Sequence, residues 1–382
     1  MIRESTAKMK KRTLWISTVC FLLIILISAA PIQAQQIKME GDVSVVLNPK
    51  KAKPPKGALT KLVLTEDFHV GDSEVEEEMI SEVSFIAVDD EENLYVLDYK
   101  GHNIKVFDSK GNYTHTIGNQ GQGPGELNMP GGLQLLPDGT MMVEDTMNRR
   151  LAFFKLDGTF IKNISVADKT SLITLVADKA GNFLGRQLII EDSKLFWEVR
   201  KFDKDLKSLF TIDRINFPNP LTDNINVFDQ VFYFNFDGSG NILYGNPREY
   251  AINIYDPEGK QIRRIEKQYS PRAVTDEEKE EILERIPTVG INIKDRLIFP
   301  KHYPAFEMFT IDEEGRLIVR TYNRGKNDEE FISDVFDTEG KLITSFSSKA
   351  SPRVWKNGKL YAIEENEDGI NIIKRYTYRW EK

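Results

Sequence analysis

Histidines are the first residues to consider for catalysis, because imidazole is both a common metal ligand and a general base. The chain has four, and no two of them have the spacing of a metal-binding pair. They fall at different positions of the repeat described below, and we expect only His302 to reach the mouth of a central channel. A three-histidine metal site is therefore not predicted. The four residues are His69, His102, His115 and His302.

Carboxylates and amides could form a second kind of site, since calcium binds to oxygen ligands. Asp89, Asp145, Asp223 and Asn224 could serve, but nothing in their spacing distinguishes them from solvated or paired side chains. A calcium-dependent hydrolase or lactonase acting in a channel stays the alternative hypothesis. The sequence has no G-x-S-x-G motif, and its single cysteine, Cys20, lies in an N-terminal apolar run. We predict no catalytic residue, no metal site and no cofactor.

Residues 118–132, GNQGQGPGELNMPGG, look at first like a phosphate-binding loop. A dinucleotide motif that starts at Gly121 requires glycine where Glu126 stands, and a P-loop that starts at Gly118 requires lysine where Pro124 stands. The residues therefore exclude both phosphate-binding interpretations. The composition favours a connector, in which glycines permit left-handed turns and prolines stiffen the chain.

The elements that must position these residues form a repeat from about residue 60 onward. Short strand-like segments alternate with turns, and residues 89–118 and 136–164 show the same order of strands and turns. Six such units can be counted, and the last one ends before a fourth strand, which residues 60–68 can supply. Closing a ring in this way removes exposed strand edges. We therefore predict an all-β fold, a six-bladed β-propeller of four-stranded antiparallel blades closed by an N-terminal strand.

One stretch resembles the NHL-repeat class of six-bladed propellers, particularly exported bacterial members with a GQGPGE loop. It covers about 83–164 and contains NLYVLDYKGHNIKVFDSKG, GQGPGEL and EDTMNRRLAFFKLDG. The family repeat carries an aspartate, then asparagine and arginine. The second unit has all three, whereas the first has Asn103 at the arginine position and the fourth has Asn246 at the aspartate position. We expect structural roles for the motif and loop residues, which are Asp98, Asp145, Asn148, Arg150, Gly121, Gly123 and Gly125.

The longest links between units define one face of the predicted ring. Strands alternate in direction, so the turn between the second and third strands of a blade lies on the same face as the links between blades. The long links at 214–230 and 270–306 therefore share this face with residues 118–132. Long loops on a rigid scaffold often carry binding surfaces. The candidate binding residues on this face are Tyr99, His102, Arg149, Lys301, His302, Tyr303 and Phe306.

The longer link begins with a predicted helix, TDEEKEEILERIP, at 275–287. Thr275 and Glu278 have capping-box spacing, and Pro287 ends the helix. This insertion lies between the fourth and fifth blades. The helix is either a lid beside the channel, with residues 301–306 lining a site, or a cover for a blade edge whose aromatic residues pack locally.

The N-terminal residues 1–34 have the layout of a secretory signal peptide. Basic residues precede an apolar run, and cleavage is expected after Ala34. An uncleaved anchor is the alternative, because the run is at the short limit for crossing a bilayer. Residues 35–59, rich in proline and lysine, are a predicted linker, and residues 60–382 are the predicted propeller. We expect a periplasmic or secreted protein, with envelope association left open and no stable membrane insertion after cleavage.

Composition bounds the choice of partner. With 40% hydrophobic and 29% charged residues, the chain of 382 residues can form a sizeable core. The formal net charge of −8 argues against a nucleic-acid partner. Since no catalytic set is predicted, the leading hypothesis is an exported, non-enzymatic scaffold that binds a protein, peptide or glycan through the face with the long links.

Overall fold

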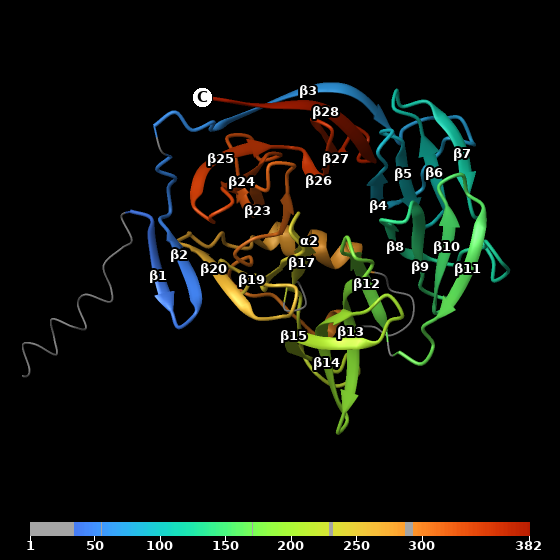
Figure 1. Ribbon diagram of the computed structural model, residues 1–382, viewed down its shortest axis with the longest axis horizontal. Coiled ribbons are helices and arrows are strands. Elements are labelled where there is room, and N and C mark those ends of the chain that lie inside the picture. The colour runs from blue at the N-terminus through green and yellow to red at the C-terminus, as the bar shows by residue number, and fades with distance from the viewer. Residues whose placement is uncertain (1–33, 55, 170, 229–231, 287–292) are drawn as a thin grey trace, which may run out of the picture.

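The computed structural model describes residues 34–54, 56–169, 171–228, 232–286 and 293–382. Except for Ala34, the predicted signal peptide lies outside these residues. Six sheets are arranged as a ring (Figure 1). The prediction of a six-bladed propeller of four-stranded antiparallel blades is confirmed.

The first three blades follow one another in chain order, and in each blade the four strands are hydrogen-bonded in sequence. The first strands of neighbouring blades contact one another around the ring, so they are the innermost strands. The strands of blade one are β4 (Val83–Val88), β5 (Leu94–Asp98), β6 (Asn103–Phe107) and β7 (Tyr113–Ile117); those of blade two are β8 (Pro130–Leu135), β9 (Thr140–Asp145), β10 (Arg150–Lys155) and β11 (Phe160–Ser165); those of blade three are β12 (Leu172–Ala177), β13 (Phe183–Glu191), β14 (Lys194–Phe202) and β15 (Ser208–Phe217).

Blades four and five keep this order, and blade six takes its outer strand from the N-terminal part of the chain. The strands of blade four are β17 (Tyr233–Phe236), β18 (Ile242–Gly245), β19 (Ala251–Tyr255) and β20 (Gln261–Lys267); those of blade five are β22 (Met308–Ile311), β23 (Leu317–Arg324), β24 (Phe331–Phe336) and β25 (Leu342–Ser348); those of blade six are β26 (Ser351–Lys356), β27 (Lys359–Glu365), β28 (Asn371–Glu381) and β3 (Lys61–Val70).

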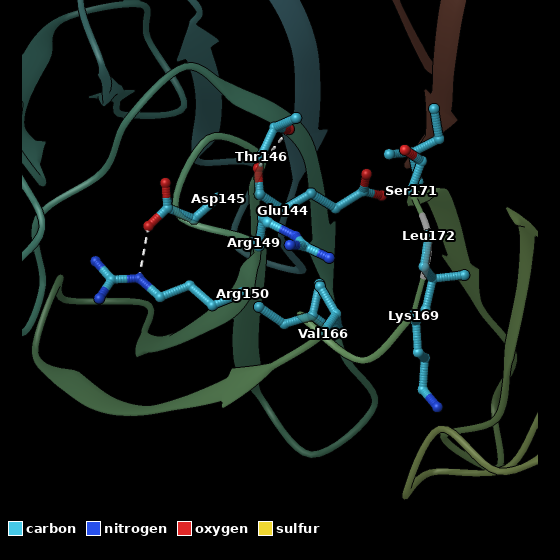
Figure 2. Close-up of a pocket in the computed structure, with 11 residues that line it drawn as sticks. Glu144, Asp145, Thr146, Arg149, Arg150, Val166, Lys169, Ser171 and Leu172 are labelled. Atoms are coloured by element: carbon cyan, nitrogen blue, oxygen red, sulfur yellow. Dashed lines mark hydrogen bonds and ion pairs between the residues drawn. The ribbon is translucent and has the colours of Figure 1, made fainter. Parts of the chain in front are cut away.

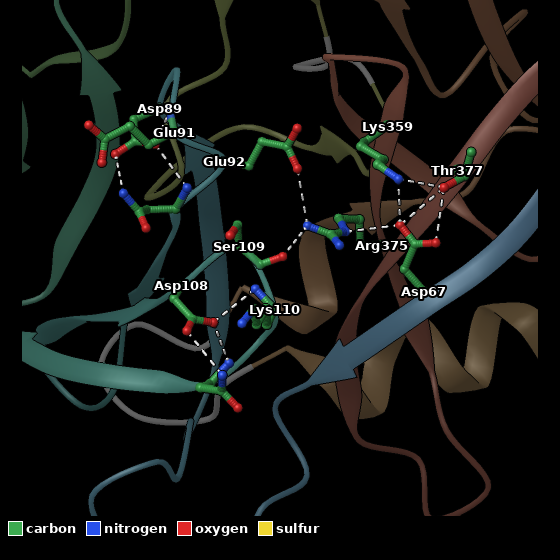
Figure 3. A network of polar contacts seen from close by, with 12 residues as sticks. Asp67, Asp89, Glu91, Glu92, Asp108, Ser109, Lys110, Lys359, Arg375 and Thr377 are labelled. Carbon is green, nitrogen blue, oxygen red and sulfur yellow. Dashed lines mark hydrogen bonds and ion pairs between the residues drawn. The ribbon is translucent and has the colours of Figure 1, made fainter.

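The ring closes where β3 pairs antiparallel with β28, so the predicted closing strand is confirmed (Figure 1). A polar network strengthens this closure (Figure 3). The guanidinium of Arg375 on β28 contacts the carboxylate of Asp67 on β3 at 3.1 Å and that of Glu92 in blade one at 3.3 Å. It also donates to the carbonyl oxygen of Ser109 at 2.6 Å. One buried arginine thus joins the closing strand, blade six and blade one.

The expected linker contains a β-hairpin. Strands β1 (Gln36–Glu40) and β2 (Val43–Asn48) pair with each other, and β2 extends blade four by pairing parallel with β20. Val45 and Val46 are fully buried. The side chain of Asn48 donates to the carbonyl oxygens of residues 266 and 340 and accepts from the N–H of residue 342. Because apolar burial and these bonds fix the hairpin, the linker interpretation is wrong for 36–48.

The hydrophobic core lies between neighbouring blades. One cluster combines Tyr95 and Leu97 of blade one with Met141 and Phe154 of blade two, and another combines residues of blades four and five. Each blade therefore buries both faces against its neighbours, which is why the strands read as apolar runs of four or five residues.

The repeating turns explain the sequence period. In most units an aspartate accepts hydrogen bonds from backbone N–H groups two and four residues later, and a glycine three residues after it adopts a positive φ. Asp108 with Gly111 and Asp178 with Gly181 are two examples. Both residue types are favoured in such turns, because aspartate bonds to the following backbone and glycine accepts a left-handed conformation.

The two long links carry the remaining elements and are joined to each other. Strand β16 (Ile225–Asn226) in the first link pairs parallel with β21 (Leu297–Ile298) in the second, just after the short 3-10 helix η1 (Lys294–Arg296). The predicted helix is confirmed as α2 (Asp276–Arg285), with both hydrogen bonds of a capping box between Thr275 and Glu278. The proline expected to end it lies outside the described residues.

Candidate functional site

The glycine-rich link at 118–132 joins β7 to β8 and is held by the motif residues of blade two. The Arg150 guanidinium donates to the carbonyl oxygens of Gln122, Gly123 and Glu126, at 2.7 to 3.0 Å. Its Nε contacts the carboxylate of Asp145 at 2.7 Å. Asp145 is fully buried, so this ion pair is shielded from solvent on the carboxylate side.

The glycines of this link are required by close contacts. The Glu126 side chain folds back and accepts from the N–H of Gly123 at 2.7 Å. A Cβ on Gly121 would lie 2.0 Å from its Oε2, and Gly125 has a φ of +79°. Asn148 donates to the carbonyl oxygen of Gly121 at 2.9 Å. The GQGPGE segment is thus a connector fixed by hydrogen bonds to its backbone.

Asp98 is the residue of blade one that is equivalent to Asp145 in blade two. Its carboxylate accepts from the N–H groups of Ser81 and Glu82, which precede the first strand of that blade, and from that of Gly101. Asp145 likewise accepts from the N–H of Asn128. The aspartate at the end of the second strand therefore fixes the incoming link, which is a structural role.

A small cavity of about 200 Å³ lies beside the turn between β9 and β10, between blades two and three (Figure 2). The buried carboxylate of Glu144 accepts the N–H groups of Thr174 and Leu175 on β12. Burial raises the pKa of Glu144 to about 7. Gly132 makes room for this side chain, since a Cβ there would lie 2.6 Å from it. Arg149 lines the cavity, but its guanidinium donates to the carbonyl oxygen of residue 167.

The face with the inter-blade links has a much larger cavity, of about 880 Å³. It lies between α2, the link before blade four, and blades five and six. Its volume is within the range of roughly 300 to 1,000 Å³ that is typical of small-molecule sites. The lining combines aromatic rings with many charged side chains.

Three aromatic rings form one wall of this cavity. Tyr303 and Tyr322 are stacked with centroids 4.6 Å apart, and Phe228 lies 5.1 Å from Tyr303. The Arg272 guanidinium lies 4.9 Å from the Tyr303 ring and is paired with Glu278 at the start of α2. Burial raises the pKa of Tyr322, so its hydroxyl stays protonated at physiological pH. The wall therefore offers apolar faces together with neutral hydroxyl groups.

Arginines form the other part of the lining. Arg320 and Arg324 lie on β23, and each guanidinium lies less than 4 Å from the centroid of Phe331. Arg320 is paired with Glu307 at 2.9 Å. Arg353 on β26 is exposed to solvent in the cavity and donates to the sulfur of Met308 at 3.4 Å. Burial lowers the pKa of Arg320, and the charge of Arg324 lowers it further.

The predicted binding residues are distributed over separate places. Tyr303 lines the large cavity. Lys301 and His302 are exposed, and their backbone pairs with the segment before α2 rather than lining the cavity. Phe306 is fully buried in the core between blades four and five, so its assignment to a binding surface is wrong. An aromatic residue in this link fills the core because blade five begins two residues later.

The other candidates lie in blades one and two. His102 accepts the N–H of Met129 through Nδ1 at 2.8 Å and so fastens the glycine-rich link. Tyr99 is half-buried beside the link before blade one, where its N–H donates to the carbonyl oxygen of Glu82. Together with Arg149, these residues do not meet Tyr303 in one site.

The sequence analysis did not identify Arg320, Tyr322, Arg324 or Arg353. One signal was available: residues 317–324, LIVRTYNR, place Arg320, Tyr322 and Arg324 at alternate positions after a buried apolar start. On a strand, alternate residues share one face. This pattern indicates a polar stripe that faces a channel, although the arginine from β26 has no such local signal.

The possible calcium ligands are separated. Asp89 accepts bonds within its own turn, Asp145 is paired with Arg150, and Asp223 accepts the N–H of Asn219. Within the described ranges, no group of three or more His, Cys, Asp or Glu side chains could hold a metal ion. In the same part of the chain, no helix is long and apolar enough to cross a membrane.

The ring of six antiparallel blades, with its longest links on one face, defines a six-bladed β-propeller. The chain belongs to the DUF5128 family of six-bladed β-propellers, whose model matches residues 74–368. No curated protein matches the sequence significantly.

Solved structures share the fold at low sequence identity. A Bacteroides fragilis protein designated as exported is 11% identical, with a TM-score of 0.51 over 88% of this chain and 100% of its own. A DUF4221 member from Bacteroides vulgatus is 13% identical, with a TM-score of 0.50 over 85% of this chain and 100% of its own. At such identities the similarity establishes the fold alone.

Proposed function

We propose that this protein is an exported, non-enzymatic β-propeller that binds a protein, peptide or glycan in the large cavity on the link face. The observation that carries the proposal is the cavity itself. Segments far apart in the sequence place a stacked tyrosine pair and a group of arginines in one cavity lining, and two of these arginines have no carboxylate partner among the described residues. Apolar faces with a few fixed polar groups are typical of ligand sites.

The opposite face offers a weaker candidate. A cavity of about 840 Å³ lies there, lined by the turns between first and second strands. The carboxylates of Asp89 and Asp178 in its wall accept hydrogen bonds from their own turns. Lys356 donates to the carbonyl oxygen of Val88 and is paired with Asp90. These polar groups are already engaged within the protein, whereas Nε2 of His115 in the same lining is buried without a hydrogen-bond partner among the described residues. The link face is favoured because its unpaired groups are charged.

The link-face cavity is also preorganised. The pairing of β16 with β21 joins the two long links, and the backbone bridge between Ala273 and His302 fixes the segment before α2 to the one after it. Since little of the wall must become ordered on binding, a smaller entropic cost opposes association.

Export is part of the proposal and rests on the N-terminal sequence and on the resemblance to exported NHL-repeat propellers. Cleavage after Ala34 would place the new N-terminus, Gln35, one residue before β1. N-terminal sequencing of protein from the cell envelope should give a chain that starts at Gln35. A chain that retains its first residues and stays in the membrane fraction would support an uncleaved anchor instead.

The binding proposal is tested by affinity capture from a cell-envelope extract of the producing organism. The baits are the mature chain, a Tyr303→Ala/Tyr322→Ala variant, and an Asp90→Ala variant as a matched control on the opposite cavity. We expect the mature chain and the control to retain one component that the double variant loses, identified by mass spectrometry and carbohydrate analysis. Equal retention by all three baits would contradict the assignment of the link face.

A further inference from the structure

Two arginines of the link-face cavity, Arg324 and Arg353, have no carboxylate partner among the described residues, and a third, Arg320, is paired through Nε alone. Arg320 and Arg324 share one aromatic ring, at 3.9 and 3.8 Å from the centroid of Phe331. This contact fixes both guanidinium groups through cation–π attraction. Arg324 has no carboxylate partner among the described residues, and Arg353 has only the thioether of Met308 as a hydrogen-bond partner there.

Among the described residues, Glu307 is the one carboxylate paired with this group of three cations. It is bonded to Nε of Arg320, and it attracts Arg353 from a greater distance. The side chain of Arg320 is only 7% exposed, and its Nη1 is buried with no hydrogen-bond partner. A buried donor without a partner costs on the order of 1–3 kcal/mol or more when charged, so its presence in a cavity wall indicates an external acceptor.

The other acids of the lining do not supply the missing charge. Glu364, Glu329 and Glu278 are paired with Lys374, Lys349 and Arg272, respectively. Three further glutamates lie exposed around the rim, and these are Glu281, Glu365 and Glu367. Arg320 is buried and Arg324 half-buried, whereas Arg353 and these glutamates are exposed, so the inner part of the cavity is cationic and its outer part carries both charges.

From this arrangement we propose that the cavity binds the carboxylate of a uronic acid residue in an oligosaccharide, held by Arg320, Arg324 and Arg353. This inference rests on the proposed function and names its ligand class. Planar guanidinium groups match a carboxylate through paired N–H donors. The stacked tyrosines provide an apolar platform for the C–H face of a sugar ring, and the charged side chains of the lining provide donors and acceptors for its hydroxyl groups.

Two features favour a saccharide with isolated carboxylates over an acidic peptide. A polyanionic chain that leaves the cavity would pass the three rim glutamates and be repelled by them. The rim therefore selects a ligand whose outer part is neutral and polar. A single carboxylate within a hydroxyl-rich body fits both the inner arginines and the rim.

The test measures binding of the purified mature chain by titration calorimetry. The probes are short oligosaccharides that contain galacturonate, glucuronate or mannuronate, each paired with its methyl ester, which removes the charge and little else. The variants are Arg324→Gln and Arg353→Gln, with Arg379→Gln as the control on an exposed part of β28. A peptide ending in a free carboxylate and its amide form a further pair of probes.

We expect at least one uronate probe to bind and its ester to bind tenfold or more weakly, about the effect of losing a charge-assisted hydrogen bond. Each cavity variant should weaken binding by a similar factor, and the control should not. Thermal melting of every variant checks that the fold is intact. No binding of any uronate probe at millimolar concentration, or equal binding of acid and ester, would overturn the inference.

The outcomes separate this inference from the proposed function. A neutral sugar or the free-carboxylate peptide that binds, and loses binding in Tyr303→Ala/Tyr322→Ala, would leave the cavity as the binding site and overturn its assignment to uronates. Uronate binding that neither the arginine variants nor the tyrosine variant affects would place the ligand elsewhere and contradict both.

Discussion

Two arginine sites on the same face of the ring use the same side chain in opposite ways. Arg150 donates to three backbone carbonyl oxygens and to a buried carboxylate, so four of its five N–H donors are used within the protein. Arg324 and Arg353 have no carboxylate partner among the described residues, and they line an open cavity. The glycine-rich link, which looks like a site in the sequence, is therefore structural, whereas the unremarked strand β23 carries the candidate site.

This difference distinguishes side chains that stabilise the fold from side chains that are available to bind a ligand. A polar side chain whose partners all lie within the protein contributes to folding, and its removal leaves buried groups unsatisfied. A fixed but unpaired side chain in a cavity contributes little to folding and is available to a ligand. The predictions below test this distinction, beginning with the largest expected effect.

Removal of the closing strand should have the largest effect. A chain that starts at Gly71 lacks β3 and the Asp67 partner of Arg375, and it exposes the edge of β28. We expect insoluble protein or a loss comparable to a typical net stability of about 5–15 kcal/mol. A chain that starts at Ala58 keeps β3 and loses only the β1–β2 hairpin, so it is the matched control in urea unfolding. Similar unfolding of both chains would contradict this closure.

Arg150→Gln should cost about 3 kcal/mol of unfolding free energy, because it leaves the buried Asp145 carboxylate without its cation. Arg324→Gln, the corresponding change in the cavity, should cost no more than about 1 kcal/mol, the scale of a cation–π contact. Urea unfolding of the two variants measures the comparison directly. Equal losses would show that the two arginines do not differ as the contacts indicate.

Glu144 should make stability depend on pH. Burial raises its folded-state pKa to about 7 from an ordinary value of 4.5, so the folded protein holds a proton that the unfolded chain releases between these values. Unfolding free energy should therefore fall as pH rises from about 4.5 to about 7, by up to about 3 kcal/mol. Glu144→Gln should reduce this dependence in urea titrations at several pH values. An unchanged slope would assign the dependence to other groups.

The smallest effect concerns the two histidines that we had expected on the binding face. His102→Ala removes the acceptor of the Met129 N–H and should cost about 1 kcal/mol. His302→Ala should be near neutral, because this side chain is exposed and its position is fixed by backbone pairing. Thermal melting distinguishes the two, and an equal shift would refute the structural role of His102.

The fold was predictable because its signals are local. Aspartate and glycine at fixed spacing define each turn, and apolar runs between turns define strands buried on both faces. The hairpin at 36–48 was missed because nearby lysines and prolines suggested an extended segment, although the run VSVVL is a strand signal. Phe306 was misassigned because an aromatic residue among prolines can equally fill a core or line a site.

The sequence by itself therefore determined the number of blades, the closing strand and the capped helix. In each case the residues that define the feature are neighbours in the chain or recur at a regular spacing. Only the tertiary structure decided which arginines are neutralised. Arg150 finds its partners within about one blade of sequence, whereas Arg320, Arg324 and Arg353 come together across two blades, and whether a charge is paired there depends on contacts that no local pattern encodes.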